Sequence, residues 1–306
     1  MDLRQPLDSR AYLLMLLLCT IWSLQQITLK ATAADFSPTL QLALRSGIAA
    51  LLVWGMMRWR GEQLTVRDGI WKPGIAVGVL FAFEFLLIGK GLQYTSAGHM
   101  IVLLYSAPIF AALGLHWKLP SERLAPLQWL GILLAFAGIA VAFLGHGSAT
   151  SVDMLIGDLL AVGAAMLWAA TTVVVRTTRL ATLPATQVLF YQLAAAFVLL
   201  LPGAWLIGHT TFHMEVPAVW AALAFQALAV SFFSYLVWFW LLRFYLASRL
   251  GVLSFLSPLL GVVLGAWLLD EPIERHFMIG AAMVLVGIVL VSGHAWLQQA
   301  LQQRRA

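Results

Sequence analysis

The 306 residues would suffice for two average soluble domains, but the composition excludes the soluble class. Hydrophobic residues make up 62% of the chain and charged residues only 10%, which is too little charge to wet the surface of a soluble fold of this size. The net charge of +5 does not indicate a nucleic-acid partner, because the basic residues never form a run of more than two.

Apolar segments separated by short connections follow one another along the whole chain. Each is long enough to cross about 30 Å of hydrocarbon as a helix of about 20 residues. The predicted helices are 11–30, 38–57, 72–92, 95–117, 126–145, 157–178, 184–208, 217–242, 247–269 and 276–295. The fold class is therefore an all-α membrane protein with ten transmembrane helices. The first segment resembles a signal peptide, but its length and its place in an internal repeat favour an uncleaved helix.

The basic residues lie mostly in the connections on one side of the predicted bundle. Fourteen of the 18 lysines and arginines fall on the side of the N-terminus, whereas the connections on the other side carry mostly aspartate and glutamate. By the positive-inside rule, both termini are predicted to lie in the cytoplasm. We expect a multi-pass protein of the bacterial cell inner membrane.

An internal repeat divides the chain into two predicted domains, 1–150 and 151–306. Three blocks recur in the same order, at offsets of 146, 150 and 149 residues. They are Trp22, Lys30, Pro38 and Gln41 with Trp168, Arg176, Pro184 and Gln187; Pro108 with Pro258; and Glu122, Gly131 and Gly138 with Glu271, Gly280 and Gly287. Because each half holds five predicted helices, an odd number, the second half enters the membrane from the opposite side. Inverted repeats of this kind give a transporter two near-equivalent conformations around one substrate site.

The predicted helix 11–30 carries three candidate substrate-binding residues, Trp22, Gln26 and Lys30. Trp22 lies in mid-helix, away from the interfacial belts where tryptophan is commonest. Gln26 offers an uncharged hydrogen bond near the junction of the two halves, or it bonds helix to helix. Lys30 lies at the outer end, against the positive-inside trend, and either binds substrate or extends outward to the membrane surface.

Two ionisable residues are predicted at membrane depth, where charge is costly and therefore a candidate for function. Glu84 lies about 12 residues into the helix 72–92, near the bilayer centre, and Arg45 lies roughly 10 Å below the outer end of the helix 38–57. They could form an ion pair that only locks two helices together. Alternatively, Arg45 binds a carboxylate and Glu84 binds an amine or a proton, which favours zwitterionic amino acids over cationic drugs.

The predicted helix 95–117 contains His99 and Pro108. His99 is either a substrate contact or a hydrogen-bonded packing residue. Pro108 and its repeat mate Pro258 each remove a backbone hydrogen bond in mid-helix, so we interpret them as hinges, with a static kink as the alternative. Gly74 and Gly78 have the spacing of small residues at a close helix–helix contact.

In the second half, Trp168 and Thr172 lie in the predicted helix 157–178, and Trp168 occupies the position that repeats Trp22. The helix 217–242 carries a stripe at the α-helical spacing i, i+3, i+4 and i+7. Its members are Ser231, Ser234, Tyr235 and Trp238. Such a face suits an aromatic ring of a substrate, through stacking and hydroxyl contacts, and core packing is the alternative.

Several classes of function have no support in the sequence. It has no Walker motif, no residues at metal-ligand spacing and a single cysteine, so we expect no cofactor, no metal, no disulfide and no direct coupling to ATP. An enzyme acting on lipid would need acid–base residues clustered near the headgroups, and none stand out. The expected partners are a small-molecule substrate, the lipid bilayer and, for coupling, protons. We expect the chain to function as a monomer.

At this point the chain resembles the drug/metabolite transporter superfamily, and within it the EamA-type exporters. The residues that carry the resemblance are Leu92-Gln93-Tyr94-Thr95-Ser96-Ala97, Pro108, Ser121-Glu122-Arg123-Leu124 and the segment from Gly157-Asp158-Leu159-Leu160 through Trp168. In the second half, Leu256-Ser257-Pro258 and Asp270-Glu271-Pro272 depart slightly from the usual pattern. The resemblance covers essentially the whole chain.

The resemblance implies a ten-helix transporter, most similar to the YddG-type exporters of aromatic and other neutral amino acids. The expected function is export of small amphipathic metabolites by alternating access. Two alternatives remain open: efflux of cationic aromatic drugs, and a non-transporting membrane scaffold, which the inverted repeat disfavours.

Overall fold

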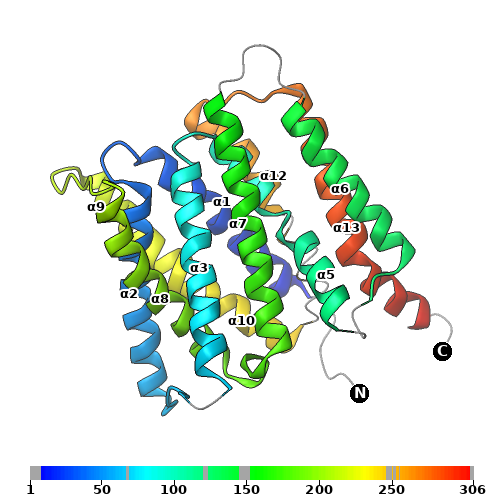
Figure 1. Ribbon diagram of the computed structural model, residues 1–306, viewed down its shortest axis with the longest axis horizontal. Helices are drawn as coiled ribbons and strands as arrows, with labels where there is room; N and C mark the ends of the chain where they lie inside the picture. Colours follow the sequence, from blue (N-terminus) through cyan, green and yellow to red (C-terminus); the bar gives the residue numbers. More distant parts are fainter. Residues whose placement is uncertain are drawn as a thin grey trace.

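The computed structural model describes residues 8–66, 69–119, 123–144, 152–245, 250, 253–254 and 256–303. Over these residues the secondary structure is helical, without a β-strand (Figure 1). The elements are α1 (Ser9–Ala31), α2 (Pro38–Trp59), α3 (Trp71–Gly91), α4 (Ala97–Leu104), α5 (Ala107–Lys118), α6 (Pro126–Leu144), α7 (Val152–Thr177), η2 (Arg179–Thr182), α8 (Ala185–Leu206), α9 (Pro217–Ala224), η3 (Phe225–Ser234), α10 (Tyr235–Phe244), α12 (Leu256–Leu269) and α13 (Arg275–Gln303).

Seven helical stretches of the described chain are long and apolar enough to cross a membrane. They are Ser9–Ala31, Pro38–Trp59, Trp71–Gly91, Ala97–Lys118, Val152–Thr177, Ala185–Leu206 and Pro217–Trp238. Three further helices of the described chain are also apolar but shorter: Pro126–Val141, Leu256–Leu269 and Arg275–Gly287. Each of the predicted helices overlaps one of these stretches. Residues 247–249, at the start of one predicted helix, lie outside the described chain, as does Glu122 of the repeat.

Large apolar side chains cover the outer surface of the bundle. Leu51, Leu133 and Val263 expose 70%, 65% and 62% of their area. Soluble proteins rarely expose apolar surface so extensively, whereas lipid tails are as apolar as these side chains. The structure is that of a multi-pass helical membrane protein.

Small residues let α3 approach α8 closely. A Cβ atom built on Gly78 would lie 2.5 Å from the Cβ atom of Ala195 and 2.9 Å from the carbonyl oxygen of Tyr191. A Cβ atom on Gly74 would lie 2.9 Å from the Tyr191 ring. The predicted close contact at these two glycines is therefore confirmed, and its partner is α8.

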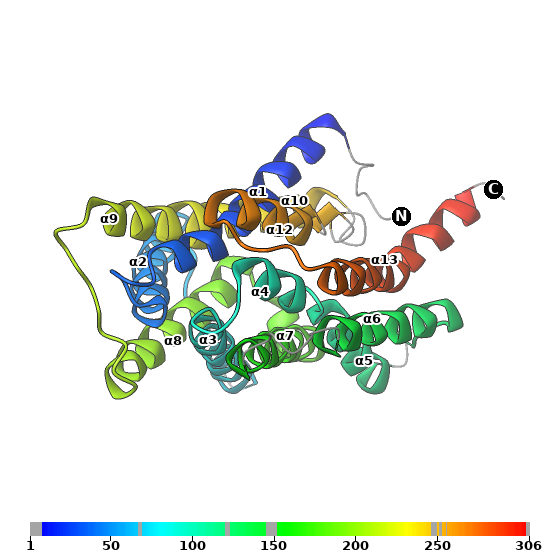
Figure 2. The ribbon, with the colours of Figure 1, turned by 90° about the horizontal axis from the view of Figure 1, so that it is seen from above.

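The helices α2 and α8 run antiparallel. At the start of α2, the hydroxyl of Thr39 lies 3.2 Å from Nδ1 of His209, which follows the end of α8. At the start of α8, the hydroxyl of Thr186 donates to the carboxylate of Glu62, which follows the end of α2, at 2.5 Å. Farther along the bundle, α6 and α13 lie side by side (Figures 1 and 2). In Figure 1, α1 begins and α13 ends toward the lower side of the molecule.

One of the predicted helices is interrupted. The predicted helix 95–117 consists of α4 and α5, which are separated by Tyr105 and Ser106, and Pro108 is the second residue of α5. Because proline lacks a backbone N–H, it is tolerated in the first turn of a helix, so Pro108 marks the start of α5. Pro258 lies in α12, and residue 255, just before α12, lies outside the described chain. A role of either proline as a hinge stays a prediction.

The predicted helix 217–242 is continuous, but its middle is the π-helix η3 rather than an α-helix. The stripe of Ser231, Ser234, Tyr235 and Trp238 was predicted from α-helical spacing, and that spacing is wrong within η3, because i→i+5 hydrogen bonds widen each turn. Both serines are fully buried, whereas Tyr235 and Trp238, which follow in α10, are partly exposed. The four side chains therefore do not form one uniform face.

Candidate functional site

Three buried polar residues from three helices form what we call the central polar cluster: Arg45 of α2, Glu84 of α3 and Gln226 of η3. Their exposed fractions are 1%, 5% and 0%. Nη1 of Arg45 donates to Oε1 of Gln226 at 2.5 Å, and Nε2 of Gln226 donates to the carbonyl oxygen of Gln25 in α1 at 2.8 Å. The cluster thus joins helices of the first half of the sequence to the π-helix of the second.

Arg45 and Glu84 interact without a direct contact. The two side chains interact electrostatically. Among the described residues, however, no nitrogen of Arg45 lies within 4.0 Å of a carboxylate oxygen of Glu84. The guanidinium instead lies over the Phe85 ring, 4.5 Å from its centroid. The predicted ion pair is therefore a longer-range electrostatic interaction and not a hydrogen-bonded lock between α2 and α3.

Both charged members of the cluster carry an unused hydrogen-bonding atom. Nε of Arg45 and Oε2 of Glu84 are buried and have no hydrogen-bond partner in the described chain. Oε1 of Gln26, a predicted site residue in α1, is likewise buried without a hydrogen-bond partner among the described residues. Burying charge or amide groups without full pairing is costly, and natural structures retain few such groups without a functional reason. This excess of unpaired polar atoms marks the middle of the bundle as the candidate substrate site.

Aromatic side chains from α1 and α10 lie beside the cluster. Nε1 of Trp22 donates to the hydroxyl of Ser234 at 2.9 Å, and the Trp22 ring meets the edge of Trp238 with centroids 5.6 Å apart. Tyr235 interacts electrostatically with both Arg45 and Glu84. The structure therefore brings Trp22, Ser234 and Trp238 together, and the role of these residues and of Tyr235 in substrate binding stays a prediction.

Trp168 and Thr172 of α7 have partners of their own. The Trp168 ring meets the edge of Tyr105, which lies in the break between α4 and α5, with centroids 5.7 Å apart. It also packs against the two largest buried apolar clusters. The hydroxyl of Thr172 donates to the carbonyl oxygen of Trp168 in its own helix, at 3.1 Å. A role of these two residues in substrate binding stays a prediction.

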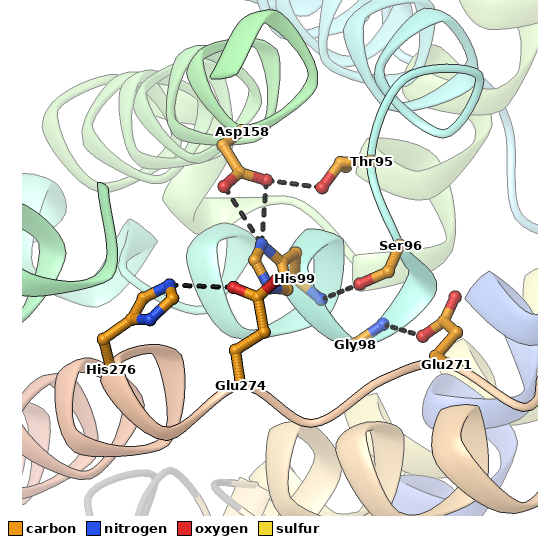
Figure 3. Close-up of polar contacts among 8 residues, drawn as sticks. All are labelled: Thr95, Ser96, Gly98, His99, Asp158, Glu271, Glu274 and His276. Carbon is orange, nitrogen blue, oxygen red and sulfur yellow. Dashed lines mark hydrogen bonds and ion pairs between the residues drawn. The ribbon is translucent and has the colours of Figure 1, made fainter. Parts of the chain in front are cut away.

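A second buried polar group lies at the N-terminal end of α4, the end away from Tyr105 (Figure 3). Nδ1 of His99 lies 3.0 Å from one carboxylate oxygen of Asp158, and the hydroxyl of Thr95 donates to the other at 2.5 Å. His99 and Asp158 are only 3% and 1% exposed. The His99 ring also stacks on Phe277 of α13, with centroids 3.7 Å apart. His99 is therefore held on one face by Phe277 and at its edge by Asp158, as a packed residue is.

Two further charged side chains hold the connection from α3 to α4 and the first turn of α4 in place. Nζ of Lys30 donates to the carbonyl oxygens of Leu92 and Thr95, at 2.6 and 2.8 Å. The carboxylate of Glu271 accepts from the backbone N–H groups of Ala97 and Gly98, at 2.6 and 3.0 Å (Figure 3). A cation at the C-terminal end of α3 and an anion at the N-terminus of α4 both complement the helix dipoles. We call Lys30, Thr95, His99, Asp158 and Glu271 the outer polar network.

The structure separates residues that the sequence grouped into one site. Leu92, the partner of Lys30, follows Glu84 by eight residues, which places the two contacts about 12 Å apart along the chain direction of a helix. Lys30 and His99 therefore belong to the outer polar network, and Glu84 belongs to the central polar cluster. Lys30 does not extend outward to the membrane surface either, because its ammonium group is bound to backbone carbonyls.

Sequence reasoning left four members of these sites out of the list of candidates, Thr95, Asp158, Gln226 and Glu271, and it also left out Tyr105, the ring partner of Trp168. Asp158 was interpreted as an acid near the outer connections, although an acid within an apolar segment could have indicated burial. Gln226 is a single polar residue in a long apolar run, which is a weak signal. Nothing in the residue type of Tyr105 indicates a functional position. Its place in the break between α4 and α5 is set by the residues that follow it, Ser106 and Pro108.

Comparison with known proteins identifies the family. The model of a family described as the EamA-like transporter family matches this chain twice, over residues 9–144 and 155–293. The chain belongs to this family. The resemblance to EamA-type members of the drug/metabolite transporter superfamily is thereby confirmed, and a transporter family is not a class of enzymes. The YddG-type subfamily is not distinguished by these matches.

Relatives of the EamA-like chain cover it almost completely. The uncharacterized transporter YvbV of Bacillus subtilis (strain 168) is 27% identical over 300 residues, which are 97% of this chain and 96% of the relative. A probable amino-acid metabolite efflux pump of Escherichia coli (strain K12) is 27% identical over 293 residues, 92% of this chain and 95% of the relative. A solved crystal structure with 24% identity superposes with a TM-score of 0.65, covers 92% of this chain and 97% of its own, and shows the similarity of fold.

Proposed function

We propose that this EamA-family transporter exports small amphipathic metabolites, principally aromatic and other neutral amino acids, by alternating access. The observation that carries the proposal is the central polar cluster. A buried guanidinium and a buried carboxylate, each with an unused hydrogen-bonding atom, lie where α2 and α3 meet η3. Charged groups at membrane depth typically mark a substrate or ion pathway.

Alternating access rests on an inverted repeat of ten helices, and four observations support it. The family model matches once in each half of the chain. The starts of α2 and α8 each contact the segment that follows the other, as two elements related by inversion would. Seven long and three shorter apolar stretches add up to ten. The described chain begins and ends on the same side, which requires an even number of crossings (Figure 1).

The chemistry of the cluster favours a zwitterionic solute. Arg45 would hold a carboxylate, and Glu84 would hold an ammonium group or exchange a proton. Trp22, Tyr235 and Trp238 supply an aromatic side for a ring. The printed name of the relative from Escherichia coli, a probable amino-acid metabolite efflux pump, is consistent with this class.

The distribution of charge supports a location in the inner membrane with both termini in the cytoplasm. With most lysines and arginines in the connections on the side of the N-terminus, both termini lie in the cytoplasm of a cell whose inner membrane holds the protein. In this orientation the outer polar network faces away from the cytoplasm. One chain contains both halves of the site, so a monomer suffices for function.

Flux measurements test the proposal. The purified chain is reconstituted into proteoliposomes, and the movement of labelled tryptophan, threonine and a quaternary ammonium dye is measured with and without a pH gradient. We expect saturable flux of tryptophan, with weaker flux of threonine, and little flux of the dye. No protein-dependent flux of any of the three would contradict a transport function for these solute classes.

A second candidate function is efflux of cationic aromatic compounds. It is favoured by Oε2 of Glu84, which has no hydrogen-bond partner among the described side chains and lies beside aromatic residues. Arg45 argues against it, because a cation bound at Glu84 would be repelled by the guanidinium. Dye flux in the absence of tryptophan flux would select this alternative.

A further inference from the structure

The buried guanidinium of Arg45 makes its side-chain hydrogen bond to a neutral group. Its Nη1 donates to the carboxamide oxygen of Gln226 at 2.5 Å, while Nε stays unpaired and Glu84 is not in direct contact. The bond to Gln226 is already strengthened by the charge of the guanidinium, but a carboxylate would add its own charge and a second parallel hydrogen bond. A guanidinium that presents a planar fork inside a protein is matched best by a carboxylate, which can engage two of its donors at once.

Gln226 is placed so that it can leave Arg45 without losing all of its partners. Its other end, Nε2, donates to the carbonyl oxygen of Gln25 in α1 at 2.8 Å. The residue is the second in η3, and π-helical segments occur rarely and often at functional sites. The side chain is fully buried, so its oxygen competes directly with any solute atom that approaches Arg45.

We propose that Gln226 is a specificity-determining residue: its carboxamide oxygen is the internal ligand that the carboxylate of a substrate displaces from Arg45. The proposal rests on the proposed function, because it requires that a solute reach the central polar cluster. The chain then selects solutes with a free carboxylate. Glu84 restricts the selection further, because its negative charge disfavours solutes that carry a carboxylate without an amine.

Two substitutions of Gln226 change the displacement in opposite directions. Gln226→Glu keeps the shape and supplies Arg45 with a fixed carboxylate, so binding of tryptophan should weaken about tenfold or more, equivalent to about 1.4 kcal/mol. Gln226→Leu keeps the volume and removes the competing oxygen, so binding of tryptophan should tighten several-fold. Tryptophanamide, which has the ring and the amine but no carboxylate, should respond to neither substitution.

The readout is the dissociation constant of tryptophan divided by that of tryptophanamide. The first constant is measured with the purified chain and radiolabelled tryptophan, and the second by competition with the amide. Gln187→Glu is the matched control, because Gln187 is also a buried glutamine but contacts the segment after α2. It should leave the ratio at the wild-type value. A loss of folding would change the amount of bound ligand, whereas only an altered carboxylate site changes the ratio.

The outcomes separate this inference from the proposed function. The inference is supported if the dissociation constant of tryptophan, divided by that of tryptophanamide, rises in Gln226→Glu and falls in Gln226→Leu. Flux and binding of tryptophan by the wild type, together with an unchanged ratio in both variants, would overturn the inference and leave the transport function standing. A wild type that neither binds nor moves tryptophan would overturn both.

Discussion

At the scale of single residues, Glu84 and Arg45 are the two charged members of the central polar cluster. Glu84 is 5% exposed and Arg45 is 1% exposed, and they interact electrostatically without an ion pair within 4.0 Å. A direct ion pair would have satisfied both and stabilised a static contact. Without such a pair, both groups are able to exchange partners in the transport cycle that we propose.

Replacing Glu84 tests whether it couples transport to protons. Glu84→Gln keeps the shape of the side chain and removes its charge and exchangeable proton, so we expect flux driven by a pH gradient to fall about tenfold or more. The midpoint of thermal unfolding should stay the same or rise, because a buried, incompletely paired charge is costly. Flux is measured in proteoliposomes with an imposed gradient. Glu215→Gln, which neutralises an exposed acid, is the control. If the response to the gradient survives in Glu84→Gln, coupling through this residue is wrong.

A different residue sets a pH dependence outside the membrane-spanning segments. Burial lowers the pKa of His209, and the positive charge of Lys90 lowers it further. The folded chain therefore binds this proton less readily than the unfolded chain, so the contribution of His209 to stability is present above the ordinary pKa of about 6.5 and is lost as the pH falls through the lower folded value. We expect faster amide exchange in residues 209–213 at pH 5 than at pH 8, after correction for intrinsic rates. Exchange that responds identically in His209→Gln would contradict this assignment.

At the scale of elements, small residues decide how closely the helices pack, and two glycines give a matched comparison. Gly78→Ala places a Cβ atom 2.5 Å from Ala195 and 2.9 Å from a backbone oxygen, and we expect it to destabilise the chain by about 1–3 kcal/mol. Gly55→Ala meets no atom within 4 Å and should stabilise α2 by about 0.5–1 kcal/mol. Thermal unfolding in detergent measures both. Similar shifts for the two variants would show that α3 and α8 are not packed through Gly78.

The sequence is sufficient to predict where most helices lie, because an apolar run of about 20 residues has few stable alternatives in a bilayer. It is not sufficient to predict the π-helix Phe225–Ser234 or the break at Tyr105, since both depend on contacts with distant helices. The same limit applies to the sites. The unusual position of Lys30 was predicted to be functional, yet its bonds go to carbonyls of Leu92 and Thr95, which no local pattern indicates.

At the scale of the whole molecule, the outer polar network joins the two halves of the chain. His99 of α4 and Asp158 of α7 form a buried pair, and Glu271, which follows α12, bonds to the first turn of α4 (Figure 3). Gly265 makes room for this carboxylate, since a Cβ atom there would lie 2.6 Å from it. Any conformation that opens the bundle on this side has to break these contacts together. In the orientation proposed above, the network lies on the outer side, where a gate of alternating access would have to open.

Asp158→Asn tests this gate. It preserves the size of the side chain but removes the charge that faces His99, so we expect the closed state to lose stability relative to an outward-open state. Opening is reported by the substitution Ile101→Cys, because Ile101 is buried against Gly261, one turn after Gly98. The natural Cys19 is replaced by alanine, so that only the new cysteine can react. We expect a membrane-impermeant maleimide, added from outside, to label this cysteine about tenfold faster in Asp158→Asn, equivalent to a shift of about 1.4 kcal/mol.

The control for this experiment is Asp153→Asn, because Asp153 lies on the same helix and carries the same charge but is exposed. Removing it should leave the rate of labelling unchanged, since its charge is solvated in every conformation. Equal acceleration by both substitutions would mean that the surface charge of α7, and not the buried pair, governs opening. Equal rates in all three chains would mean that His99 and Asp158 stabilise the fold without controlling access, since breaking the pair would then favour neither conformation.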